Sequence, residues 1–236
     1  MNISKSFKRV VAAGIIVALA AVAYYSWVLY SARKYTVETI LPREKVTFYP
    51  LTPSSLTPRQ LEILLKVEDP HFFEHGGVDF STPGAGITTI TQGLVKHLYF
   101  DQFKPGLAKI KQTLIAAFVL DPLIPKGVQL RRFINTVYLG KGTSGFEQAA
   151  KIYFHKSFAQ LTEDEYIAIV AMIIAPETFN IEKFPDRNKE RANRIKRLIS
   201  GEYKPRGLFD LYYGPLDAEI QKKIPPLSYF KSVMSG

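Results

Sequence analysis

A long uncharged segment near the N-terminus constrains this chain more than any other feature of its sequence. Residues 10–32 run for 23 positions without a charged side chain, and a helix of that length can cross the roughly 30 Å hydrocarbon core of a bilayer. Aromatic residues, which favour the headgroup region, gather towards its C-terminal end: Tyr24, Tyr25, Trp27 and Tyr30. Basic residues flank its other end: Lys5, Lys8 and Arg9. The sequence therefore predicts a short basic N-terminus over residues 1–9 and a transmembrane helix over residues 10–32.

A cleaved signal peptide is the competing interpretation of the same segment. Ala21, Val22 and Ala23 resemble a small-x-small cleavage site. The apolar run continues well past that site, which favours an uncleaved span. The positive-inside rule does not decide the orientation of the helix, because basic residues flank both of its ends. Those on the far side are Arg33, Lys34, Arg43 and Lys45.

The composition of the whole chain predicts a globular domain with an anionic partner. The chain has 236 residues, 47% of them hydrophobic, which is enough to build one core. A net charge of +10 points to nucleic acid, to the phosphate face of a membrane or to a phosphorylated substrate. Cysteine is absent, which excludes disulfides, thiolate zinc sites and a thiol nucleophile.

The spacing of apolar residues predicts a mainly α-helical domain over residues 57–200. Helices are expected to start at Thr57-Pro58, a hydroxyl cap followed by proline, and at Thr162, which forms a capping box with Glu165. Further apolar residues at three- and four-residue spacing predict helices over residues 109–120, 129–139, 145–154 and 189–199. Residues 33–56 contain three prolines and are expected to form a linker, with a short strand over residues 45–49. Residues 201–236 are expected to form an irregular C-terminal extension.

Two polar segments are the candidates for a catalytic or binding site. The segment EDPHFFEHGGVDF, residues 68–80, places four acids and two histidines in a turn-rich stretch directly after a predicted helix, so that Glu68 lies at a helix end. The segment GITTITQG, residues 86–93, offers hydroxyls and an amide that suit sugar or phosphate oxygens, and Lys96 and His97 follow it within one turn.

At these residues the chain resembles the glycosyltransferase domain of monofunctional peptidoglycan transglycosylases and bifunctional penicillin-binding proteins. The family motif E-D-x-x-F-x-x-H-x-G-x-D is matched at every fixed position: Glu68, Asp69, Phe72, His75, Gly77 and Asp79. The second motif, G-x-S-T-I-T-Q-Q, is similar to GITTITQG, with Thr88 in place of Ser and Gly93 in place of the last Gln. KGVQLRRFIN, residues 126–135, resembles a later motif that ends in Asn135.

The resemblance implies a lysozyme-like helical domain that polymerises lipid II. It also implies a single-pass protein of the bacterial inner membrane, with the catalytic domain on the outer side. The expected partners are lipid II, the growing glycan strand, the membrane and other cell-wall synthesis proteins. Nucleic acid is not expected, because the basic helix over residues 189–198 is interpreted as a solvated face.

The residue types fit that chemistry. Attack by a sugar hydroxyl on an anomeric carbon needs a base, for which Glu68 is the candidate. A diphosphate leaving group needs cations rather than a general acid. The expected substrate-binding residues are Asp69, His75, Thr88, Thr89, Gln92, Lys96, Lys109, Lys111 and Asn135.

The chain departs from the family at the third motif, R-K-x-x-E. Lys109, Ile110 and Thr113 stand where the family has Arg, Lys and a second catalytic Glu, and no Glu occurs between Glu74 and Glu147. Two hypotheses follow. Either the enzyme works with lysines neutralising the diphosphate, requiring no cofactor although Mg²⁺ remains an alternative, or it is a catalytically weak relative that binds lipid II.

A zinc metallopeptidase is a rival interpretation of the first segment. His71, Glu74 and His75 match H-x-x-E-H. That site requires a continuous helix, whereas Pro70 precedes the match and two glycines follow it. We therefore expect no metal ligands there.

Overall fold

The computed structural model describes residues 5–104, 106–140 and 142–215, and these residues form helices and loops. No β-strand occurs in these ranges, where the only pairing of this kind is an isolated bridge between Tyr138 and Ser144. The elements in chain order are α1 Lys5–Tyr35, η1 Thr36–Ile40, α2 Leu41–Val46, η2 Pro53–Ser55, α3 Pro58–Glu68, α4 Ile90–Tyr99, α5 Leu107–Ile115, η3 Ala116–Leu120, α6 Asp121–Leu123, α7 Lys126–Thr136, α8 Phe146–Phe154, η4 Phe158–Gln160, α9 Glu163–Met172 and α10 Pro185–Ser200. The predicted mainly α-helical class is confirmed.

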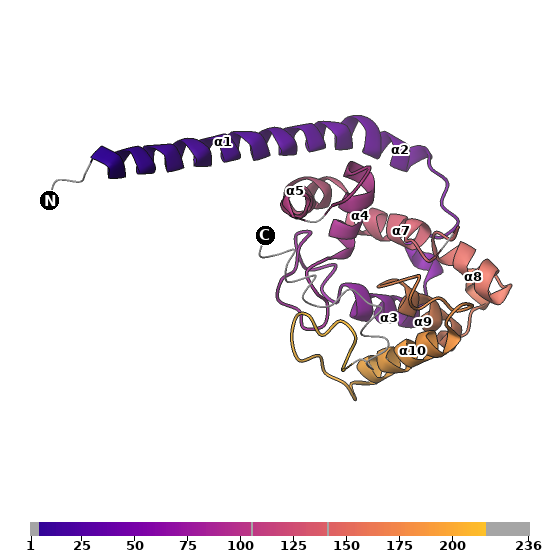
Figure 1. The fold of residues 1–236 in the computed structure, drawn as a ribbon. Helices are drawn as coiled ribbons and strands as arrows, with labels where there is room; N and C mark the ends of the chain where they lie inside the picture. Colours follow the sequence, from indigo (N-terminus) through magenta and orange to yellow (C-terminus); the bar gives the residue numbers. More distant parts are fainter. Residues whose placement is uncertain (1–4, 105, 141, 216–236) are drawn as a thin grey trace.

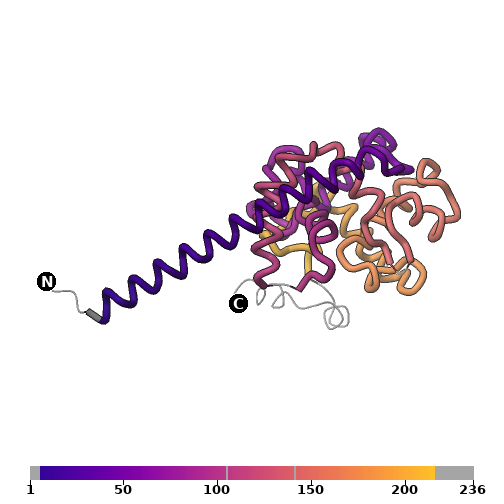
Figure 2. Tube along the Cα trace, turned by 90° about the horizontal axis from the view of Figure 1, so that it is seen from above, coloured from indigo at the N-terminus to yellow at the C-terminus, as the bar shows by residue number. Residues whose placement is uncertain are grey.

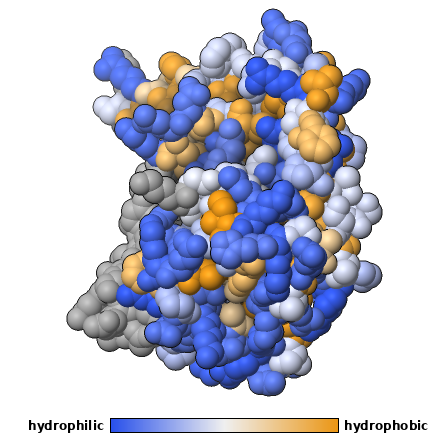
Figure 3. Space-filling model, turned by 90° about the vertical axis from the view of Figure 1, so that its right-hand side faces the viewer, coloured by the Kyte–Doolittle hydropathy of each residue, from blue (hydrophilic) through white to orange (hydrophobic). Residues whose placement is uncertain are grey.

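The apolar N-terminal segment is helical. Among the described residues, one helix is long and apolar enough to cross a membrane, and it covers Ser6–Val46, because α1 continues through η1 into α2. In the most apolar 18-residue stretch of this helix, no residue is buried inside the protein. Its N-terminal part projects away from the domain, whereas its C-terminal part passes over it (Figures 1 and 2). The face on the side of α8 is mainly hydrophilic (Figure 3).

The linker predicted over residues 33–56 is wrong for most of its length. The chain stays helical to Val46, and the strand expected over residues 45–49 is not formed. The helix docks on the domain: Thr36 shares a 2.6 Å hydrogen bond with the Tyr99 hydroxyl, and the buried Glu44 pairs with Arg132. A π-helical turn, η1, lies at this docking point, and π-turns inside helices are frequent at functional positions.

The helix starts predicted from local signals are confirmed. Thr57 and Thr162 cap α3 and α9, and each forms a capping box with the residue three positions later. The predicted segments over residues 109–120, 129–139, 145–154 and 189–199 correspond to α5 with η3, α7, α8 and α10. α4 was not predicted, because residues 86–93 were interpreted only as a polar segment suited to sugar or phosphate oxygens.

The core lies where α3, α4, η3, α7, α8, α9 and α10 meet. Tyr166 of α9 is fully buried and contacts Phe146 and Phe158, with ring centroids 5.5 and 5.9 Å away. This aromatic cluster fixes α9 next to α3, since the Tyr166 hydroxyl donates to the Gln60 carbonyl at 3.0 Å. α3 runs from this contact in its first turn to its last residue, Glu68.

The C-terminal extension is described only as far as residue 215; residues 216–236 lie outside the described part of the chain. Residues 201–215 have no regular secondary structure, as predicted. They fold back from α10 beside the loop of residues 69–89 (Figure 1).

Candidate active site

Glu68 is the last residue of α3, and its side chain is half-buried. Among the described residues its carboxyl group has neither a hydrogen-bond partner nor an ion-pair partner. Burial raises the pKa of Glu68 to about 7; Arg191 opposes this rise and Asp69 adds to it. An unpaired carboxyl with this pKa can exchange a proton at neutral pH, as a general base requires.

The next residue, Asp69, organises the turn after the helix. Its buried carboxylate accepts from the His75 Nε2 at 2.8 Å and from the Ile90 backbone N–H at 2.9 Å. The His75 Nδ1 accepts from the Gly77 N–H at 3.1 Å, so the ring proton is assigned to Nε2. Asp69 thus joins the end of α3 to the start of α4.

Thr89 and Gln92 hold the start of α4 in place through hydrogen bonds. Thr89 caps α4, and its hydroxyl donates to the Gly77 carbonyl at 2.7 Å. The buried Gln92 amide donates to the Thr113 hydroxyl at 3.0 Å. Asp69, Thr89 and Gln92 therefore make positioning contacts inside the fold, and the direct substrate contact expected of them stays a prediction.

A cationic cluster lies at the start of α4, on the side that the sequence assigned to the diphosphate. The Lys109 ammonium donates to the Thr88 hydroxyl at 3.0 Å and to the Ile87 carbonyl at 3.2 Å. Burial, and after it the charge of Lys96, lowers the pKa of Lys109 to about 8. Thr88 and Lys96 are exposed, and the Lys96 ammonium lies 5.6 Å from the centre of the Phe103 ring. The structure therefore brings together Thr88, Lys96 and Lys109.

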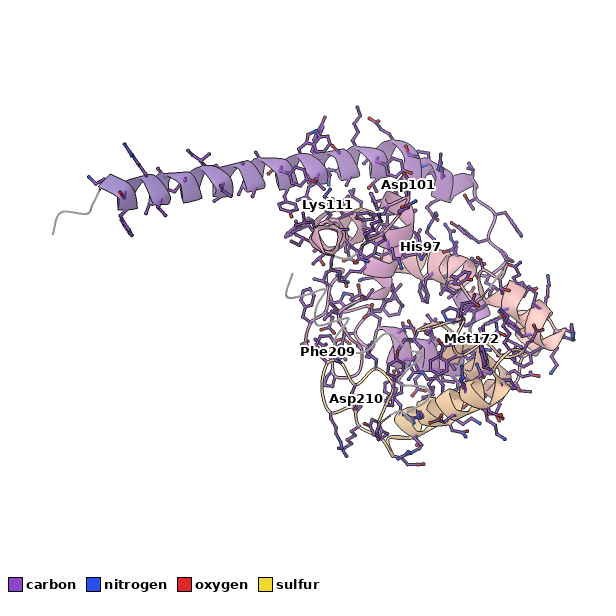
Figure 4. The ribbon with its side chains drawn as sticks, in the orientation of Figure 1. His97, Asp101, Lys111, Met172, Phe209 and Asp210 are labelled. Atoms are coloured by element: carbon purple, nitrogen blue, oxygen red, sulfur yellow. The ribbon has the colours of Figure 1, made fainter. Side chains whose placement is uncertain are left out.

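Lys111 and Asn135 have their contacts outside the cluster of Thr88, Lys96 and Lys109. The Lys111 ammonium sits 5.1 Å from the centre of the Tyr24 ring, beneath α1 (Figure 4). The Asn135 side chain bonds both backbone polar groups of Leu51 and the Arg131 carbonyl. A cavity of about 310 Å³ next to Asn135 has neither Glu68 nor Lys109 in its wall. These contacts lie outside the cluster around Lys109, and the role of Lys111 and Asn135 in substrate binding stays a prediction.

In the described ranges no group of three or more His, Asp or Glu side chains is placed to hold a metal ion. Residues 70–80 form turns rather than the continuous helix that a zinc metallopeptidase needs. His71 bonds Thr82, whereas His75 bonds Asp69, so the two imidazoles do not share a ligand position.

Asp79, the last fixed acid of the first motif, holds the loop. It accepts from the Ser81 N–H at 2.7 Å and from the Thr82 hydroxyl. Burial alone would raise the pKa of Asp79, but the hydrogen bonds from Thr82 and Ser81 hold it well below its ordinary value. Asp79 therefore stays ionised and fixes the turn.

Sequence reasoning missed two neighbours of Glu68, namely Tyr166 and Tyr213. The pKa of each tyrosine is raised, first by burial and in part by Glu68. Arg191 lies in the segment that the sequence analysis interpreted as a solvated basic face, but it is buried here, with its guanidinium 4.7 Å from the centre of the Tyr213 ring. No local sequence pattern signals these contacts, because the residues come from α9, α10 and the extension.

The half-buried Glu68 carboxyl, without a fixed partner among the described residues, and the cationic cluster around Lys109 fit a helical domain of the glycosyltransferase class. A family model described as "Transglycosylase" matches residues 36–199, more than half of the chain. The chain therefore belongs to the transglycosylase family.

Curated relatives agree with this assignment. Penicillin-binding protein 1F of Bacillus subtilis is 31% identical over 159 residues, 61% of this chain and 22% of the relative. Penicillin-binding protein 1A of Escherichia coli is 31% identical over 175 residues, 68% of this chain and 20% of the relative. Penicillin-binding protein 1A of Aquifex aeolicus is 29% identical over 194 residues, 75% of this chain and 26% of the relative. The chain thus spans about a fifth to a quarter of the length of these relatives.

Proposed function

We propose that this protein polymerises lipid II into glycan strands, with release of undecaprenyl diphosphate and with Glu68 as the general base. The observation that carries the proposal is the state of Glu68: a half-buried carboxyl without a fixed partner among the described residues, whose pKa lies near 7. A carboxylate tied into a permanent ion pair would be a much weaker base.

In the proposed reaction the 4-hydroxyl of one sugar attacks the anomeric carbon of another. Glu68 takes the hydroxyl proton as the new carbon–oxygen bond forms. The bond from the anomeric carbon to the diphosphate breaks, and its electron pair leaves with the diphosphate. That leaving group is already a weak base, so it needs positive charge rather than a proton, and Lys96 and Lys109 supply this charge beside the Thr88 hydroxyl.

We further propose that turnover needs no divalent cation. Thr113 stands where the resemblance places a second Glu, and its hydroxyl accepts from Gln92. A hydroxyl in that position is a poor magnesium ligand compared with a carboxylate. The Lys109 ammonium can neutralise the diphosphate directly.

The proposed location is the bacterial inner membrane, with one span and the catalytic domain on the outer side. The single apolar helix in the described part of the chain supports a span, and the net charge of +10 suits an anionic lipid surface. The growing glycan strand and other cell-wall synthesis proteins are the proposed partners.

The test is a polymerisation assay with purified full-length protein and lipid II, read as glycan polymer on a gel. Glu68→Gln keeps the size of the side chain but removes the base, so no polymer should form. Glu74→Gln is the matched control, because Glu74 lies in the same motif but is exposed. Polymer formation by the Glu68→Gln protein at the wild-type rate would contradict the proposal.

A catalytically weak relative that binds lipid II is the second candidate, and Thr113 is the residue that favours it. This candidate predicts that the wild-type protein binds lipid II without forming polymer in the same assay. Binding with no polymer from wild type would therefore replace the first proposal by the second.

A further inference from the structure

Residues 203–215, which we call the C-terminal strap, form an ordered loop outside the family match at residues 36–199. The Asp210 carboxylate organises it, accepting from the Tyr203 hydroxyl at 2.6 Å and from the Arg206 and Gly214 N–H groups at 3.0 Å. Figure 4 labels Asp210 in this loop, at the end of the domain away from α1. The strap is thus held together by its own hydrogen bonds.

Two arginines of α10 attach one side of the strap. Arg191 donates to the Leu211 carbonyl at 2.7 Å, and Arg194 donates to the Pro215 carbonyl at 2.8 Å. Arg194 also reaches the carbonyls of Tyr212 and Gly214. Charged donors on backbone carbonyls make stronger hydrogen bonds than neutral donors.

The other side of the strap lies on the loop that joins the two catalytic motifs. The N–H groups of Gly84 and Gly86 donate to the carbonyls of Gly207 and Leu208, both at 2.9 Å. A Cβ at Gly84 would lie 2.7 Å from Pro205, and a Cβ at Gly86 would lie 2.8 Å from Leu211. Only glycine permits this close approach, so the loop and the strap fit each other.

Tyr213 connects the strap to the general base. It is 3% exposed, and its hydroxyl donates to the carbonyl of Val67, the residue before Glu68, at 3.2 Å. Its ring packs against Arg191, which is itself buried. The backbone of Tyr213 has φ +55°, a conformation that non-glycine residues rarely adopt. Such strain persists only where surrounding contacts enforce it.

We propose that the C-terminal strap completes the wall around the general base and that Tyr213 is a positioning residue for Glu68. The inference rests on the proposed role of Glu68. The Tyr213 hydroxyl holds the last turn of α3, and its ring keeps water away from the carboxyl group. The titratable and charged groups around Glu68 are Asp69 from the adjoining turn, Tyr166 from α9, Arg191 from α10 and Tyr213 from the strap.

The first test compares two tyrosines in full-length protein with lipid II as substrate. Tyr213→Phe removes the hydroxyl bond to Val67 and should lower kcat about fivefold with KM unchanged. Tyr153→Phe is the matched control, because the Tyr153 hydroxyl of α8 also donates to a backbone carbonyl, that of Leu139 at 2.7 Å, and Tyr153 is not one of the groups around Glu68. Equal kcat values for the two variants would overturn the proposal.

The second test follows the carboxyl group itself and does not require turnover. In protein with ¹³C-labelled glutamate side chains, the Glu68 signal is assigned by its loss in Glu68→Gln and is titrated by NMR. Its midpoint, about 7 in the wild type, should move towards the ordinary value of 4.5 in Tyr213→Leu, because water reaches the carboxyl. An unchanged midpoint in folded Tyr213→Leu would overturn the inference.

The two readouts separate the two proposals. A wild-type protein that makes no polymer contradicts the proposed function, whereas the NMR titration still decides the role of Tyr213. If Tyr213→Leu does not fold, the comparison of Tyr213→Phe with Tyr153→Phe decides it.

Discussion

Replacing Glu68 by Gln should stabilise the folded protein at pH 8 and leave its stability nearly unchanged at pH 4. Burial raises the pKa of Glu68 from 4.5 to about 7, so the folded state binds this proton more tightly than the unfolded state. The resulting stabilisation is complete below pH 4.5 and is lost as the pH rises through 7. Each pKa unit corresponds to about 1.4 kcal/mol, so ionised Glu68 costs at most about 3 kcal/mol at pH 8.

The assay is thermal unfolding in detergent micelles, followed by far-UV circular dichroism. Fluorescence is unsuitable, because the only tryptophan is Trp27 in the apolar helix. For a domain of this size, about 3 kcal/mol corresponds to an increase in Tm of roughly 6–12 °C at pH 8. The exposed Glu74→Gln control should show no such increase. Equal Tm values for wild type and Glu68→Gln at pH 8 would refute the reasoning from burial.

Three further predictions concern the donor side, the docked helix and the turn. Turnover should persist in chelator, and Lys109→Met should reduce it by about a hundredfold in chelator and magnesium alike; rescue by magnesium would contradict direct neutralisation. Glu44→Ala leaves the half-buried Arg132 beside α2 without its carboxylate partner and should lower the free energy of unfolding by about 3 kcal/mol, measured with urea; a loss below about 1 kcal/mol would mean that the pair is dispensable. Gly77→Ala should destabilise the protein by more than about 2 kcal/mol in the same assay, since its Cβ would lie 2.6 Å from the Ala116 carbonyl oxygen at φ +85°; wild-type stability would show that the turn can rearrange.

The parts of the fold that local signals control were predictable from the sequence. Thr57 followed by proline, and Thr162 with Glu165 three positions later, marked the starts of α3 and α9, because these signals link residues that are close in sequence. The helix predicted from Thr57 onward, followed by a turn-rich segment, placed Glu68 at a helix end. The charge-free run of residues 10–32 marked the apolar helix.

The errors arose where contacts distant in sequence decide the structure. The helix continues to Val46 because Thr36 and Glu44 dock on α4 and α7, which no local pattern reveals. Lys109 and Lys111 were grouped by sequence, yet residues two apart on a helix do not face each other. Tyr213 was missed because its partners lie about 20 residues away in α10 and 146 residues away at Val67.

The pH dependence of the initial polymerisation rate tests the role of Glu68 most directly. Because the base must be deprotonated, the rate should rise with a midpoint near pH 7, and it should fall again above about pH 8 as Lys109 loses its proton. A rate that is constant from pH 5.5 to 8.5, or that rises with a midpoint near 4.5, would contradict the assignment of the half-buried Glu68 as the general base.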